Sequence, residues 1–233
     1  MAGSNWWYYL DMKKIGKGVQ YDVYDVGNGR VRKIESSFLQ KIYRFHKIAP
    51  KYKIYSHPLH NIKTVMEAIR MTKQSIDSLR KHQINIDCEL LGNPTIIDDN
   101  NYEQDFAITL GDVLHSSDLQ KKKELIDKYI DNILACWGYG FSDTVFNFMI
   151  NSGITSRGNV ITTDLGELTF NRKEIEILVR DKHWEKRSSF NKLKDIDLKN
   201  YIREQFNTRI TISNLDKLWN SCQAVHIPLQ SYF

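Results

Sequence analysis

Cysteine is scarce in this chain, which contains only Cys88, Cys136 and Cys222. No two of them form a Cys-x-x-Cys pair, and an odd number of thiols cannot all pair with one another. We therefore expect a reducing compartment, the cytoplasm, and neither a disulfide framework nor a structural zinc site. The seven histidines show no His-x-x-x-His or mixed Cys/His spacing, so a transition-metal site is not expected either.

Long apolar runs are also missing. No stretch approaches the roughly 20 residues that a membrane-spanning helix needs, and the N-terminal residues lack the pattern of a signal peptide. We expect no membrane partner. A Gly-x-Ser-x-Gly motif is absent as well, so the sequence does not point to serine hydrolysis.

The chain itself has 233 residues, of which 41% are hydrophobic and 12% aromatic, enough to bury a core as one large domain or two small ones. Its formal net charge is +5. A solvated, lysine-rich surface is the simpler interpretation of this excess, and a basic surface over residues 40–55 that binds nucleic acid is the alternative.

The hydrophobic pattern of the first half predicts a strand-rich region with one long helix. Gly27-Asn28-Gly29 is typical of a hairpin turn, because these residues tolerate positive φ angles. The expected elements are strands within residues 6–34, a packed insert over 36–58 with helical spacing from Phe38 to Phe45, a helix over 61–83, two short strands within 84–97, and a strand from Phe106 that runs into a hinge-like Gly111.

The second half is mostly helical by the same criterion. Ser117 or Asp118 can cap its first helix, which is expected to end near Trp137. The remaining expected elements are a short apolar strand after residue 147, a strand that ends at Asp164, and helices over 172–186, 195–206 and 213–223.

The stretch that bears most directly on function lies in this half. Asp143 and Asn147 share a loop, and the strand further along ends in Asp164-Leu165-Gly166. Carboxylate and amide oxygens are the hard ligands that suit Mg²⁺ beside a nucleotide phosphate. Far upstream, Gly16-Lys17-Gly18 precedes a hairpin whose returning strand bears Lys33. Such a hairpin can cover a triphosphate and place an ammonium group beside it.

The order of these parts resembles the protein-kinase-like fold over roughly residues 13–170. The segment from Gly16 to Val23 looks like the glycine-rich loop, with Tyr21 in place of its third glycine. Val31-Arg32-Lys33-Ile34 is similar to the Val-Ala-Ile-Lys strand, and Asp164-Leu165-Gly166 looks like Asp-Phe-Gly.

The resemblance implies an α+β fold of two lobes. Residues 1–112 would form the strand-rich N-lobe and residues 113–233 a reduced helical C-lobe. ATP would bind between the lobes, near a hinge at residues 109–114.

It also implies roles for single residues on the nucleotide side. Backbone N–H groups at Gly16 and Gly18 would approach the phosphates, where a side chain would block them. Lys33 would neutralise the α- and β-phosphates. Glu67, the only glutamate of the 61–83 helix, is the candidate for the acidic partner of Lys33, although it lies away from the apolar stripe; Asp77 lies nearer the stripe but has a shorter side chain.

On the catalytic side, Asp143 would orient the acceptor hydroxyl and take its proton, and Asn147 and Asp164 would hold Mg²⁺. The function so implied is an ATP- and Mg²⁺-dependent kinase that transfers the γ-phosphate to a hydroxyl. A protein Ser/Thr acceptor is preferred over a small molecule, because no pocket signature for a small molecule is visible in the sequence.

Several departures from the kinase pattern keep an inactive pseudokinase, a module that binds nucleotide or protein, as an alternative. Phe141-Ser142 replace His-Arg, and Val145 stands where many protein kinases carry a lysine. The spacing from Asp143 to Asn147 is one residue short, and no Ala-Pro-Glu follows Asp164.

Overall fold

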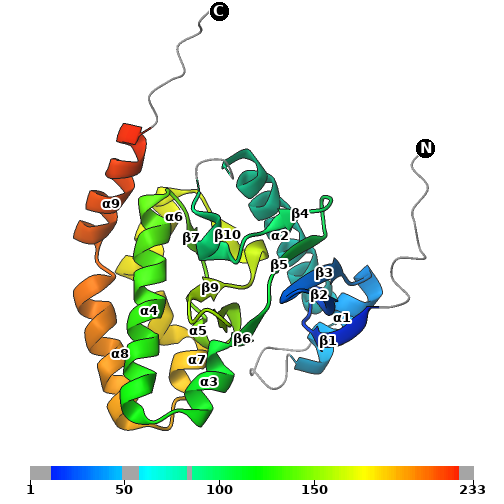
Figure 1. Ribbon diagram of the computed structural model, residues 1–233. Coiled ribbons are helices and arrows are strands. Elements are labelled where there is room, and N and C mark those ends of the chain that lie inside the picture. Colours follow the sequence, from blue (N-terminus) through cyan, green and yellow to red (C-terminus); the bar gives the residue numbers. More distant parts are fainter. Residues whose placement is uncertain (1–11, 49–57, 83–85, 226–233) are drawn as a thin grey trace, which may run out of the picture.

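The computed structural model of the protein describes residues 12–48, 58–82 and 86–225 (Figure 1). Helices and antiparallel strands are combined in this part of the chain, which confirms the α+β class. The five-stranded sheet and the helices α1 (Phe38–Ile48) and α2 (Pro58–His82) lie to one side, and the long helices of the second half lie to the other. The strand expected within Trp6–Leu10 falls outside the described residues.

The largest sheet has the order β1-β2-β3-β5-β4, and all of its neighbouring strands are antiparallel. Gly27, Asn28 and Gly29 all have positive φ angles of 54–81° and connect β2 to β3, so the predicted hairpin turn is confirmed. The strands are β1 (Lys13–Lys17), β2 (Tyr21–Gly27), β3 (Arg30–Glu35), β4 (Thr95–Ile96) and β5 (Tyr102–Asp105).

Two helices follow β3, as the sequence predicts. On α1 (Phe38–Ile48) two basic side chains point back to the sheet: Lys41 pairs with Glu35, and Arg44 binds both carboxylate oxygens of Asp22. The second helix, α2 (Pro58–His82), buries an apolar stripe that includes Val65, Ile76 and Leu79. Residues 49–55, which complete the basic surface considered over residues 40–55, lie outside the described residues.

Two strands were expected between residues 84 and 97, and the prediction of the first, before Gly92, is wrong. Residues Cys88–Leu91 form a short 3₁₀ helix, η4, because Asp87 caps it by accepting a hydrogen bond from the Glu89 N–H. Gly92 ends this helix in the left-handed region, at φ 68°. Only β4, which follows, is a strand.

The expected hinge at residues 109–114 is largely helical. The strand β6 (Ala107–Thr109) is present, but Thr109 caps the helix α3 (Leu110–Ser116) by accepting a hydrogen bond from the Asp112 N–H. Gly111 therefore lies inside α3, where a Cβ atom would be 2.7 Å from the Met149 carbonyl oxygen. This glycine serves close packing rather than hinge motion.

The next helix, α4 (Leu119–Gly138), begins at an Asp118 cap as predicted. The apolar strand expected after residue 147 is instead one turn of helix, α5 (Phe148–Asn151), because the Asn147 carbonyl accepts from the N–H groups of Ile150 and Asn151. The strand comes later, as β8 (Ser152–Thr155), and pairs with β6 and with β9 (Val160–Thr162). A second ladder joins β7 (Ser142–Asp143) to β10 (Leu168–Thr169). The 3₁₀ turn η5 (Leu165–Glu167) directly precedes β10.

Helices close the chain, in agreement with the predicted pattern. They are α6 (Arg172–Arg180), the 3₁₀ helix η6 (His183–Lys186), α7 (Ser188–Asn191), α8 (Ile196–Arg209) and α9 (Ile212–Val225). α8 and α9 both pack on α4. Their apolar faces form the main core, around Trp137, Phe146 and Phe206.

A second, smaller core connects the sheet to the segment around Asp164. It contains Leu79 of α2, Tyr102 of β5, Phe141, Leu165 of η5 and Leu168 of β10. This cluster fixes the position of the Asp-Leu-Gly segment relative to the sheet. Elements far apart in sequence therefore meet at the candidate site.

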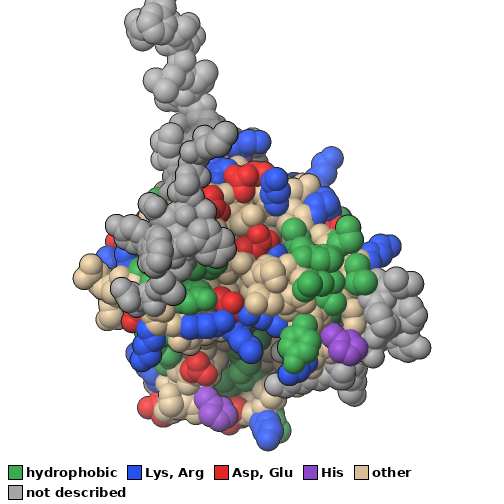
Figure 2. Space-filling view, turned by 90° about the vertical axis from the view of Figure 1, so that its right-hand side faces the viewer, with side chains coloured by type: hydrophobic (Ala, Val, Ile, Leu, Met, Phe, Trp, Pro, Cys, Tyr) green, Lys and Arg blue, Asp and Glu red, His purple; other side chains and the backbone are tan. Residues whose placement is uncertain are grey.

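The exposed face on the side of the sheet carries charges of both signs. Figure 2 shows Lys and Arg side chains interspersed with Asp and Glu side chains there. Exposed hydrophobic side chains are present too, among them Phe38, Leu39 and Tyr43 of α1. Within the part of the chain that the structure describes, no helix is both long and apolar enough to cross a membrane.

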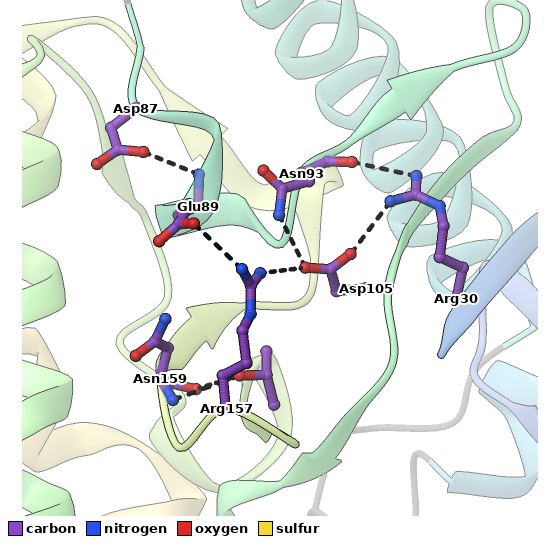
Figure 3. Close-up of polar contacts among 8 residues, drawn as sticks. Arg30, Asp87, Glu89, Asn93, Asp105, Arg157 and Asn159 are labelled. Atoms are coloured by element: carbon purple, nitrogen blue, oxygen red, sulfur yellow. Dashed lines mark hydrogen bonds and ion pairs between the residues drawn. The ribbon is translucent and has the colours of Figure 1, made fainter. Parts of the chain in front are cut away.

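A polar network ties the end of β5 to the rest of the molecule (Figure 3). The Asp105 carboxylate accepts hydrogen bonds from Arg30 at 3.1 Å, Asn93 at 2.8 Å and Arg157 at 3.1 Å. Arg157, from the turn between β8 and β9, also contacts Glu89 at 3.2 Å. Asp105 therefore links the five-stranded sheet to the β8–β9 hairpin directly before the chain leaves the sheet.

Candidate active site

Lys33 projects from the middle of the sheet toward the segment that precedes Asp164. Its ammonium group donates a hydrogen bond to the Thr163 carbonyl and lies 5.4 Å from the centre of the Tyr102 ring. Burial lowers the pKa of Lys33, and the charges of Asp164 and Glu167 act in the opposite direction. The structure thus brings together the lysine and the Asp-Leu-Gly segment that the sequence singled out.

The Asp-Leu-Gly segment is fixed by α2. Ser75 donates to the Leu165 carbonyl at 2.5 Å and accepts from the Leu168 N–H at 3.0 Å. A Cβ atom at Gly166 would be 2.8 Å from the Thr72 hydroxyl, so a glycine is needed for this close approach. The Asp164 side chain caps η5 through one oxygen, which accepts from the Gly166 N–H at 3.0 Å.

Asp143 lies in β7, where it is only 8% exposed and faces Leu168 across the ladder. One carboxylate oxygen accepts a hydrogen bond from the Val145 N–H at 2.8 Å. Burial, supported by the negative charge of Asp164, raises the pKa of Asp143 to about 7. A carboxyl group poised near neutral pH suits proton transfer.

Two residues that the sequence reasoning missed lie beside these acids. Asn151, at the end of α5, donates from its side chain to the Glu167 carboxylate. Burial raises the pKa of Glu167, and the charges of Asp164 and Asp143 raise it further. We refer to Asp143, Asp164 and Glu167 as the acidic cluster. The available signals were modest: Glu167 directly follows Asp-Leu-Gly, and Asn151 is the next amide after Asn147.

Arg187, the residue before α7, is a second cation near the cluster. Its charge acts on both Asp143 and Glu167, and one guanidinium nitrogen lies 2.9 Å from His183 Nδ1. Its Nε atom is buried without a hydrogen-bond partner in the described part of the chain. Nothing in the sequence marked this arginine, which lies 20 residues beyond Glu167 and belongs to no motif.

The loop between β7 and α5 contains an unusual backbone conformation. Phe146 has a φ angle of 49°, in the left-handed region, and its side chain is fully buried. Such a conformation costs on the order of 1–3 kcal/mol for a bulky residue and is often found near functional sites. It also places Asn147, whose Oδ1 atom is buried and has no hydrogen-bond partner among the described residues.

The two glycines of the predicted phosphate loop lie at the β1–β2 turn. Gly16 is in β1, at an irregularity of the ladder. The Gly18 N–H donates to the Tyr21 carbonyl at 2.8 Å, and Arg44 of α1 contacts the Gly18 carbonyl at 3.1 Å. Tyr21 packs edge-on against Tyr102, with 5.4 Å between ring centres, so an aromatic side chain occupies the position of the third glycine.

Glu67 is not brought to Lys33. It lies on the exposed side of α2, with 54% of its side chain accessible, and pairs with Arg70 one turn away. The reason is the helical period: the residues of α2 that face the Asp-Leu-Gly segment are Thr72 and Ser75, on a different side of the helix. The acids near Lys33 come from the second half of the chain instead.

The oxygen donors of this site fit a hard cation. Asp164 offers a carboxylate, and the unpaired Asn147 Oδ1 offers an amide oxygen that no described group uses. Among the described residues no group of three or more His, Cys, Asp or Glu side chains is arranged to hold a metal ion. Mg²⁺ in phosphoryl-transfer sites is held by one or two carboxylates together with phosphates and waters, so such a group is not required.

A groove of about 950 Å³ adjoins the cluster, between α2 and the chain from Gly166 to Glu174. Thr144 and Glu167 contribute to its lining, and Trp219 of α9 contributes as well. We call it the α2 groove. It joins the acidic cluster to the surface on the side of α2.

No protein-family model matches the chain, and a search of the curated proteins finds no match either. The interpretation of this site therefore depends on its own residues and geometry.

Proposed function

We propose that the protein is an ATP- and Mg²⁺-dependent phosphotransferase with a two-lobed, protein-kinase-like fold. The observation that carries the proposal is the convergence of Lys33, from the third strand, with Asp164 and Glu167 from a segment more than 130 residues later. A lysine on this strand and an Asp-x-Gly aspartate are the parts that position phosphates and metal in kinases.

The arrangement of elements supports the kinase-like fold. Residues 1–112 contain the five-stranded antiparallel sheet, which carries Lys33 on β3. They also contain the long helix α2, which packs against the Asp-Leu-Gly segment. The rest of the chain is mainly helical and contains the loop with Asp143 and the hairpin that leads to Asp164. The cytoplasmic location expected from the cysteines belongs to the same proposal.

Each residue has a physical reason for its role. The turn with Gly16 and Gly18 would let the phosphates approach the backbone closely, because neither residue has a side chain; the Gly18 N–H itself donates to the Tyr21 carbonyl. Lys33 would neutralise the phosphate charge. Asp164 and Asn147 would hold Mg²⁺, which offsets the charge that gathers on the transferred phosphoryl group. Asp143 is the carboxylate that the sequence nominates to take the acceptor proton, with a pKa near 7.

The acceptor is proposed to be a hydroxyl group, preferably of a Ser or Thr side chain in a protein. A small-molecule alcohol is the alternative. The open α2 groove beside the cluster supports a polymeric acceptor, because it extends along the surface rather than enclosing a compact ligand.

A pseudokinase is the second candidate function. The observation that favours it is the exposed position of Glu67, which leaves Lys33 without the helix glutamate that active protein kinases use. Such a protein would bind nucleotide or a partner without transferring phosphate.

Thermal unfolding with ATP, with and without Mg²⁺, combined with a γ-phosphate transfer assay, tests the proposal. A ligand that binds only the folded state raises the melting temperature. We expect a Mg²⁺-dependent shift and measurable turnover. A rise in melting temperature without turnover would favour the pseudokinase. An unchanged melting temperature with ATP, both with and without Mg²⁺, would refute nucleotide binding.

A further inference from the structure

Glu167 differs from the other members of the acidic cluster in its position. It lines the α2 groove, whereas Asp143 and Asp164 are not among the described residues that line it. Thr144 and Gly166, which lie next to it in the lining, are buried. Of the three acids of the cluster, Glu167 is therefore the one that a molecule in the groove adjoins.

We propose that Glu167 is the general base that takes the proton of the acceptor hydroxyl, and that the acceptor approaches along the α2 groove. The inference rests on the proposed phosphotransferase function. It assigns to Glu167 the proton transfer for which the sequence nominates Asp143.

The surroundings hold Glu167 in place for this role. Its carboxylate accepts a hydrogen bond from the Asn151 side chain, and its backbone carbonyl accepts from the N–H and the hydroxyl of Thr144 at 2.9 and 3.0 Å. A reacting group fixed by neighbours in this way loses little entropy when the acceptor binds. Burial and the charges of Asp164 and Asp143 raise its pKa, in the direction that a base working near neutral pH requires.

Asp143, in contrast to Glu167, binds the backbone of the loop that follows it. It is 8% exposed within a strand ladder, and one of its oxygens accepts from the Val145 N–H. This bond stabilises the turn that leads to the strained Phe146. Asp143 therefore shapes the loop, whereas Glu167 belongs to the lining of the groove in which an acceptor can bind.

The step balances without a further reactant. The acceptor oxygen forms a bond to the γ-phosphorus of ATP, the bond from that phosphorus to the β,γ-bridging oxygen breaks, and ADP leaves. The hydroxyl proton moves to the Glu167 carboxylate and is then released to water.

The length of the groove points to an extended polypeptide as acceptor. The α2 residues in its lining run from Glu67 to Lys81, about 21 Å of helix at 1.5 Å per residue. An extended peptide of about six residues covers that distance. Both acidic and basic side chains line the groove, including Asp77, Lys81 and Arg172, which suits a polar segment with a Ser or Thr.

The test compares E167Q, D143N and E124Q. Glu124 lies on the exposed side of α4, pairs with Lys121 one turn away and does not line the groove, so E124Q is the control. Two quantities are measured: Mg-ATP affinity, by titration calorimetry, and the rate of γ-phosphate transfer to a degenerate peptide library with a fixed Ser or Thr. We expect E167Q to lower kcat by about 100-fold or more and to change the Mg-ATP dissociation constant less than threefold. E124Q should keep kcat within threefold.

Other outcomes would overturn the inference. A kcat of E167Q within threefold of wild type, with D143N strongly impaired, assigns the base to Asp143. Loss of Mg-ATP affinity in E167Q assigns Glu167 to the metal or nucleotide. Wild-type protein that binds Mg-ATP but transfers no phosphate overturns this inference and the phosphotransferase, and absence of Mg-ATP binding refutes the nucleotide site as a whole. If E167Q does not fold, E167D keeps the charge one methylene further back, and unchanged kcat in that variant also contradicts the role.

Discussion

The Lys33 ammonium group donates a hydrogen bond to the Thr163 backbone carbonyl, although 130 positions separate the two residues. This contact places a partly buried cation directly beside the residue that precedes Asp164. Since burial lowers the pKa of Lys33, the protein stabilises this charge only incompletely. Lys33 is therefore the residue at which the proposed nucleotide site can be separated from a structural role.

The first prediction follows from this cost. K33M removes a poorly solvated charge and keeps an apolar chain of similar length, so the melting temperature should stay the same or rise. The affinity for Mg-ATP should fall at least tenfold, because one charge-assisted contact to phosphate is lost. Differential scanning fluorimetry and calorimetry measure the two effects. K13M, at an exposed position of β1 outside the glycine-containing segment, is the control and should change neither. A large loss of stability with unchanged affinity would make Lys33 a structural residue.

The second prediction concerns Asp164 and Mg²⁺. D164A should remove the Mg²⁺-dependent part of the thermal shift by ATP and abolish phosphate transfer, because a carboxylate ligand of the metal is lost. D181A, at an exposed position after α6, should behave like wild type. Equal Mg²⁺-dependent shifts in D164A and wild type would remove Asp164 from the metal site.

Local chemistry made much of this fold predictable from sequence. The Gly27-Asn28-Gly29 turn requires positive φ angles, and Asp118 is a helix cap of the usual kind, so both were correctly assigned. Caps also explain two errors. Thr109 starts α3 where a hinge was expected, and Asp87 starts η4 where a strand was expected. In both places a side chain that binds a nearby N–H group decided the conformation.

The candidate site was predictable only where a motif marked it. Lys33 and Asp164 stood in recognisable patterns, and the structure brings them together. Glu67 depended on the orientation of a helix about its axis, which tertiary packing sets. Arg187 could not be found at all, because its proximity to Asp143 depends on how α7 packs near α5.

The third prediction is a pH dependence of stability. Burial raises the pKa of Asp143 to about 7, above that of the unfolded chain, so the folded state binds more protons between these values. The contribution of protonated Asp143 to the free energy of unfolding is therefore present at low pH and is lost as pH rises from about 4 to about 7. D143N, which stays neutral and can still accept the Val145 N–H bond, should lack this loss. A pKa raised by about three units corresponds to roughly 4 kcal/mol, so D143N should exceed wild type by an amount of this order at pH 8. Urea denaturation at pH 5 and pH 8 measures it. Glu167 also has a raised pKa, so D143N should keep a pH dependence of stability in the same direction, smaller than that of the wild-type protein. Identical pH profiles for the two proteins would contradict the buried, unpaired state of Asp143.

The last prediction separates two parts of the network around Asp105. Its carboxylate, 19% exposed, accepts from Arg30, Asn93 and Arg157, so D105A leaves several donors without a partner. We expect D105A to lower the free energy of unfolding by about 1–3 kcal/mol. E89Q breaks only the contact with Arg157, in which both side chains are more than half exposed, and should cost less than about 0.5 kcal/mol. Urea denaturation of both variants tests the difference. Because Asp105 joins the sheet to the β8–β9 hairpin, D105A should also weaken Mg-ATP binding. If D105A and E89Q change Mg-ATP affinity and unfolding free energy equally, this junction does not position the site.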